Sequence, residues 1–210
     1  MPKGYAIHDT KNWTDFKVTE FELKTAEPED VTLEIDCCGV CGSDVHTISG
    51  GWGELAVPFC IPGEDIVGHI EQVHLHADNS LSGHEIVGKV TEVGDKVKGI
   101  KVGDRVGVGA QVGSCLNCPP CKSDNENYCK GDGKNAMVDT YNSKYANGDI
   151  AQGGYSTHIR AHQQFVFPIP EAISSEDACS MLCGGITVYS PLLRNGCGQQ
   201  AKRVAIVGIG

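Results

Sequence analysis

Four cysteines near the middle of the chain have the spacing of a metal site. They fall within fifteen residues, and three of them recur at every third position: Cys115, Cys118, Cys121 and Cys129. Four thiolates complete the shell of a tetrahedral Zn²⁺ ion and leave no position open for chemistry. Free or disulfide-bonded thiols are the alternative, but a regular cluster without secretory features favours metal binding. The spacing predicts a structural zinc loop.

A second group of chemically active side chains follows an expected strand. Cys41, Ser43, Asp44 and His46 offer a thiol, a hydroxyl, a carboxylate and an imidazole within six residues. Each one alone has an ordinary explanation, since cysteine is frequently just a small buried apolar residue. Their concentration at a glycine-flanked turn favours a functional site, with a further metal ligand as the first interpretation.

His84 and Glu85 begin another glycine-bounded segment, 83–94, whose pattern predicts a strand. Adjacent residues of a strand point to opposite faces of the sheet. Both side chains could therefore reach one metal ion only if the strand is distorted at this point.

Short strands and turns must position these groups. The 27 glycines and 9 prolines lie largely between short apolar runs, which predicts a β-rich body. Residues 17–36 predict two strands joined by a turn, and residues 97–108 and 153–170 predict more short strands.

The pattern changes after Pro170. Ser174, early acidic residues and apolar spacing predict a helix to Cys183, interrupted by two glycines and resumed over 186–193. Residues 203–207 then predict a short apolar strand leading into Gly208 and Gly210. A dinucleotide-binding βαβ unit opens in this way, with glycines where the pyrophosphate approaches, although Gly-x-Gly alone is weak support.

The net charge and composition argue against some classes of binding partner. A net charge of −10 and the lack of a Lys/Arg cluster argue against nucleic acid and anionic membranes. No apolar run reaches the length of a membrane span. Eleven cysteines, an odd number, favour reduced thiols in the cytoplasm.

Together these motifs resemble the zinc-dependent alcohol dehydrogenases of the medium-chain dehydrogenase/reductase superfamily, and in particular the NADP-preferring cinnamyl alcohol dehydrogenase branch. The matching segments occur in the family's order over nearly the whole chain; they are 39–46, 83–88, the four-cysteine loop, 153–155 and 178–189. The resemblance implies a mainly β, GroES-like, partly open barrel at 1–170. It also implies linking helices and the first strand of an incomplete α/β Rossmann domain at 171–210.

The resemblance also implies roles for individual residues. A catalytic zinc would be held by Cys41, His84 and Cys183, with Glu85 as an exchangeable carboxylate. The cofactors would be two zinc ions and NADP(H), and the substrate a small alcohol or aldehyde. Ser43 and His46 would carry the alcohol's proton. Trp52 would line the substrate pocket, although a packed surface tryptophan is an equal alternative, and Gly208 and Gly210 would bind the cofactor. Homodimers are usual in this branch.

Two departures from the family pattern affect the expected activity. Residues 64–83 separate Pro62-Gly63 from His84-Glu85, which are contiguous in the family. A local duplication would explain the segment, and so would a retained intron, which we favour because its removal restores Pro-Gly-His-Glu. We expect the longer loop to displace His84 from Cys41 and Cys183.

The second departure is at Gly210, where the family continues. We therefore expect the polypeptide as written to bind NADP(H) weakly and to turn over little. A non-catalytic, zinc-binding GroES-like module is the alternative function. Quinone or enoyl reduction is disfavoured because those branches generally lack both zinc sites. The residues that distinguish NADP from NAD lie beyond the sequence.

Overall fold

The structure, a computed structural model, describes residues 1–61 and 83–208. The proposed insert, apart from its last residue, and Gly210 lie outside the described residues. The strands are β1 (Lys3–Ala6), β2 (Lys17–Glu20), β3 (Asp30–Cys38), β4 (Ile86–Val93), β5 (Arg105–Val108), β6 (Gln111–Gly113), β7 (Val138–Asp139), β8 (Ser143–Lys144), β9 (Ile150–Ala151), β10 (His158–His162) and β11 (Val166–Pro168). The α-helices are α1 (Gly42–Ile48), α2 (Ser175–Ser180) and α3 (Ile186–Arg194), and 3₁₀ turns cover Thr10–Asn12, Cys121–Ser123, Glu126–Tyr128 and Gln163–Phe165.

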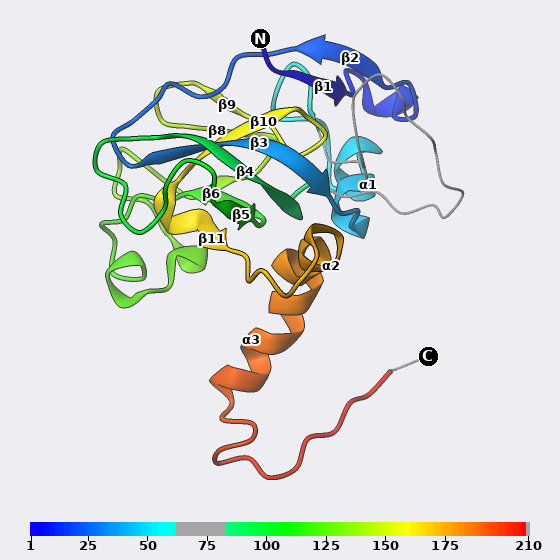
Figure 1. The fold of residues 1–210 in the computed structure, drawn as a ribbon. Coiled ribbons are helices and arrows are strands. Elements are labelled where there is room, and N and C mark those ends of the chain that lie inside the picture. The colour runs from blue at the N-terminus through cyan, green and yellow to red at the C-terminus, as the bar shows by residue number, and fades with distance from the viewer. Residues whose placement is uncertain (62–82, 209–210) are drawn as a thin grey trace.

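A five-stranded antiparallel sheet forms the centre of the molecule. Its order is β10-β3-β4-β5-β11, and it curls into an open half-barrel (Figure 1). The strands are rich in valine and isoleucine, whose branched side chains fit a pleated surface. The inward side chains make one apolar core that includes Leu33, Ile86, Val90 and Val106. Burying each such side chain stabilises the fold by roughly 1.5–3 kcal/mol.

Two expectations about strands are wrong. The strands within 17–36 exist, but they do not pair with each other: β2 pairs with β1, and β3 lies between β10 and β4. Residues 203–207 form no strand, and Val207 is 95% exposed. An apolar strand of this kind needs neighbouring strands and covered faces. No described residue supplies a neighbouring strand for it.

The helical segment after Pro170 follows the prediction. Ser174 caps α2 by accepting a hydrogen bond from the Asp177 amide at 3.1 Å. Met181–Gly185 then forms a π-helical turn around the predicted glycine interruption, and α3 resumes to Arg194. Figure 1 shows α3 projecting from the β-rich body, while α2 packs on β3 and β4. The π turn places Cys183 at the end of the half-barrel.

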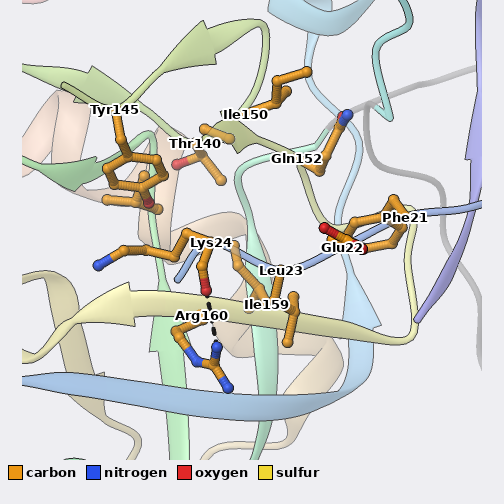
Figure 2. A pocket seen from close by; sticks show the side chains of 12 residues that line it. Phe21, Glu22, Leu23, Lys24, Thr140, Tyr145, Ile150, Gln152, Ile159 and Arg160 are labelled. Atoms are coloured by element: carbon orange, nitrogen blue, oxygen red, sulfur yellow. Dashed lines mark hydrogen bonds between the residues drawn. The ribbon is translucent and has the colours of Figure 1, made fainter. Parts of the chain in front are cut away.

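A buried ion pair fixes the segment before β3 to the sheet. The ammonium of Lys24 lies 2.6 Å from the Asp30 carboxylate and 5.0 Å from the centre of the Tyr145 ring. Arg160 donates a hydrogen bond of 2.8 Å to the Lys24 carbonyl (Figure 2). The cavity beside these groups has a volume of about 10 Å³, which suits one water molecule rather than a substrate.

Candidate metal centres and substrate pocket

The four-cysteine loop folds its sulfurs around one point. The Sγ–Sγ distances are 3.9 Å for Cys115–Cys121, 3.4 Å for Cys118–Cys121, 3.9 Å for Cys118–Cys129 and 3.5 Å for Cys115–Cys129. Four sulfurs about 2.3 Å from a tetrahedral zinc would lie about 3.8 Å apart. Backbone amides of Cys121 and Lys130 lower the pKa of Cys118 to about 6, so one thiolate forms readily. The donor set therefore fits a structural zinc ion.

Three parts of the fold deliver the second donor set. Cys41 precedes α1, His84 and Glu85 precede β4, and Cys183 lies in the π turn. Their ligand atoms all lie within 4.8 Å of one another. The Cys41 and Cys183 sulfurs are 3.7 Å apart, and His84 Nε2 is 3.0 Å from the Cys183 Sγ. These separations are again close to the edge of a zinc tetrahedron. The expectation that the longer loop displaces His84 from Cys41 and Cys183 is therefore wrong.

The placement of His84 and Glu85 resolves the problem of their adjacency. Both residues lie ahead of β4 rather than within it, so the strand's alternation does not separate them. Glu85 is buried, and its carbonyl accepts a hydrogen bond from the Gly39 amide at 2.9 Å. A side chain on Gly39 would collide with the Glu85 carboxylate. The close approach of Glu85 and Cys179, rather than the backbone conformation, favours glycine at this position.

A buried carboxyl group lies on the Nδ1 side of His84, while Nε2 faces the Cys183 sulfur. Asp44 is fully buried; its Oδ1 has no hydrogen-bond partner and lies 3.7 Å from His84 Nδ1. Burial raises the pKa of Asp44 to about 8, and the nearby Tyr141 hydroxyl opposes this rise. Burial also lowers the pKa of His84, which favours the neutral imidazole that a metal requires. Asp44 thus lies near the ring nitrogen that a ligating histidine uses toward an outer carboxyl group.

A cavity of about 370 Å³ opens beside this centre. Ser43, Trp52, His84 and Cys183 are among its lining residues. The Ser43 Oγ lies 3.3 Å from the Cys41 Sγ. His46 is exposed, and its ring stacks on Trp52 with the centroids 5.3 Å apart. The cavity therefore joins the candidate metal centre, a hydroxyl and an aromatic wall.

Among the predicted site residues that the structure describes, Gly208 belongs to neither donor set and does not line the cavity. It has a φ of 80° and ends an exposed coil in which residues 203–208 form no strand, so the described residues build no nucleotide site there. Asp44 belongs to the group at 41–46 that predicts a site, but the sequence assigned it no individual role. Sequence reasoning missed Tyr141 altogether, because an isolated tyrosine carries no spacing signal.

Comparison with known sequences places the chain in a family. The family described as "Alcohol dehydrogenase GroES-like domain" matches residues 27–83 and 78–171, which is more than half of the chain. The chain belongs to this family of alcohol dehydrogenase GroES-like domains. The two matched stretches meet within the unusual segment before His84.

Individual relatives share the resemblance. An NADP-dependent alcohol dehydrogenase of Saccharomyces cerevisiae is 46% identical over 99% of this chain and 51% of its own length. A probable cinnamyl alcohol dehydrogenase of Populus deltoides is 40% identical over 90% of this chain and 46% of its own. The chain thus spans about half the length of these curated relatives.

Solved structures agree with the fold. A cinnamyl alcohol dehydrogenase from Helicobacter pylori, solved with NADP(H), is 34% identical with a TM-score of 0.75, over 92% of this chain and 48% of its own. A cinnamyl alcohol dehydrogenase from Sorghum bicolor is 32% identical with a TM-score of 0.73, over 93% of this chain and 48% of its own. Within the described residues, no helix has the length and apolar character needed to cross a membrane.

Proposed function

We propose that this chain provides the zinc-binding catalytic centre for NADP(H)-dependent interconversion of primary alcohols and aldehydes, of the cinnamyl or medium-chain type. The observation that carries the proposal is the convergence of Cys41, His84, Glu85 and Cys183 beside a cavity. A zinc ion held by these residues would supply a Lewis acid that polarises the substrate oxygen. The four-cysteine loop would hold a second, structural zinc.

The chain's own residues would transfer the substrate's proton to water. Ser43 Oγ faces the cavity close to Cys41, where it can accept a proton from an alcohol hydroxyl. His46 lies one helical turn further along α1 and is exposed, so its imidazole can release a proton to water. The Trp52 indole would contact the flat or extended part of the substrate.

Binding of NADP(H) is proposed from the relatives, two of which carry that cofactor in their names or titles. The residues proposed to contribute are Gly208 and Gly210, and no further step is assigned to this chain's residues. We propose a homodimer for full-length members of the family. For this chain we propose a cytoplasmic location and no nucleic-acid or membrane partner. The acidic net charge of −10 and eleven free cysteines are in keeping with this.

Metal content under native conditions tests the proposal first. We expect two zinc ions per chain, and one in the His84→Ala variant. The matched control is His158→Ala, which removes a histidine that is absent from both donor sets. A wild-type chain that binds one zinc, unchanged by His84→Ala, would refute the catalytic centre.

Assays with NADPH separate the enzyme from its alternative. Turnover of cinnamaldehyde, with loss in the Ser43→Ala variant, would support the dehydrogenase. A chain with two zinc ions that neither binds NADPH in equilibrium dialysis nor turns over aldehyde would favour a non-catalytic zinc-binding module. The four-cysteine loop is the observation behind that second candidate, because a closed shell of four sulfurs stabilises a fold without offering a position for chemistry.

A further inference from the structure

We propose that Tyr141 is a positioning residue for His84, holding the imidazole and its carboxylate neighbour in the orientation that the metal centre requires. The inference rests on the proposed function in one respect: it takes His84 as a zinc ligand. Tyr141 lies just after β7, whereas His84 lies just before β4 and Asp44 lies in α1. One tyrosine thus connects three separate parts of the fold.

The first contact is ring on ring. The Tyr141 and His84 centroids are 5.9 Å apart, and the two planes meet at 22°. This is an offset stack, a favoured arrangement of aromatic rings. Both rings are buried, so the stack is shielded from water. It limits the tilt of the imidazole and so helps keep Nε2 directed toward the Cys183 sulfur, 3.0 Å away.

The second contact is with the carboxylate neighbour. The Tyr141 hydroxyl lies beside the Asp44 carboxyl group, within hydrogen-bonding reach. Asp44 Oδ1 faces His84 Nδ1 at 3.7 Å and has no hydrogen-bond partner. The Tyr141 hydroxyl therefore restrains Asp44, which faces Nδ1, the His84 nitrogen that would not bind the metal. Outer neighbours of this kind set the orientation of a ligating histidine.

The backbone holds Tyr141 in place. The amide of its neighbour Thr140 donates a hydrogen bond of 3.0 Å to the Ala110 carbonyl, and β7 pairs with β6. The backbone on either side of His84 is hydrogen-bonded as well. Stacking on Tyr141 adds a restraint on the imidazole ring itself, which these backbone hydrogen bonds do not reach.

Zinc affinity provides a readout that does not depend on turnover. A chelator competition on the whole chain should give two release steps, and the step missing in His84→Ala identifies the His84 centre. We expect Tyr141→Leu to weaken that step by about 10–100-fold, the usual effect of losing an outer neighbour. The four-cysteine step should stay unchanged. Tyr141→Phe keeps the ring and should retain more affinity than Tyr141→Leu.

Tyr145→Leu is the matched control, because it truncates another largely buried tyrosine that packs against Lys24 instead of His84. The spectrum of the Co²⁺-substituted chain should change for the His84 centre in Tyr141→Leu and stay the same in Tyr145→Leu.

The outcomes separate this inference from the proposed function. Wild-type affinity in Tyr141→Leu would overturn the inference and leave the metal centre intact. An equal loss in Tyr145→Leu would also overturn it, by showing only general destabilisation. A wild-type chain without a His84-dependent release step would overturn both proposals.

Discussion

The sulfurs of Cys37 and Cys179 lie 3.3 Å apart, each four residues before a cysteine of the candidate catalytic centre. Both are buried, and Cys37 is the last but one residue of β3 while Cys179 lies in α2. Their contact packs the helix that leads to Cys183 against the strand that leads to Cys41. The thiol–thiol contact, with desolvation, also raises the pKa of Cys37 far above its ordinary value.

We predict that this pair resists alkylation in the folded protein. The thiolate is the reactive form. Burial restricts access to both thiols, and the raised pKa of Cys37 further suppresses its thiolate. Iodoacetamide at mildly alkaline pH should label the partly exposed Cys197 well before Cys37 or Cys179. Peptide mass spectrometry measures the three rates, and unfolding in denaturant should equalise them. Labelling of Cys37 as fast as that of Cys197 in the folded chain would contradict the packing described here.

Lys24→Met should destabilise the protein strongly. The substitution leaves the Asp30 carboxylate, which is 3% exposed, without its cation. Breaking a buried pair in this way costs about 3–5 kcal/mol. Denaturant unfolding measures the loss. The control Lys96→Met removes a lysine whose partner Glu29 is 3.7 Å away on the surface, and it should cost no more than about 1 kcal/mol. Equal effects of the two variants would show that burial is not the cause.

The pH dependence of stability should include a contribution from Asp149. Its carboxylate accepts hydrogen bonds from the Thr25 amide at 2.6 Å and from the Asn147 side chain at 2.7 Å. The amide hydrogen bond is the main cause that lowers the pKa of Asp149 below 3.8. Ionisation therefore stabilises the fold above pH 3.8, and this contribution disappears as the pH falls through the lower native pKa.

The Asp149→Asn variant keeps a side-chain acceptor but loses the charge. Its unfolding free energy should fall below that of the wild type above pH 3.8, and the two should converge in stronger acid. NMR titration of the wild-type carboxyl gives the native pKa directly. A native value at or above 3.8 would refute the predicted sign.

The sequence pointed to both groups of candidate ligands, one through local spacing and the other through family resemblance. The every-third spacing of Cys115, Cys118 and Cys121 encodes a local turn, so it could be interpreted without the fold. Cys41, His84 and Cys183 are far apart in sequence, and only the resemblance to a family grouped them before the structure showed their convergence.

Other features depend on long-range packing that no local pattern records. The pairing of β2 with β1 and the contact between Tyr141 and His84 join segments that local periodicity cannot connect. The apolar run 203–207 has the composition of a strand but no neighbouring strand among the described residues. Composition indicates that a segment suits a strand, but the segment forms one only when a neighbouring strand pairs with it.

Gly39 offers the most specific test of the geometry around Glu85. A Cβ at position 39 would collide with the Glu85 carboxylate, and it would also press against Cys179. Gly39→Ala should therefore displace Glu85 and, through the adjacent backbone, His84. We expect the chain to lose the His84-dependent zinc and to keep the four-cysteine zinc.

Gly42→Ala is the matched control, because a Cβ there would meet nothing within 4 Å. It lies three residues away, at the start of α1, where alanine is also the better helix former. This variant should keep both zinc ions and lose no stability. Native mass spectrometry compares the two variants directly. If Gly39→Ala keeps both ions, the backbone before α1 can yield to an added methyl group, and close packing against Glu85 is not what sets the position of His84.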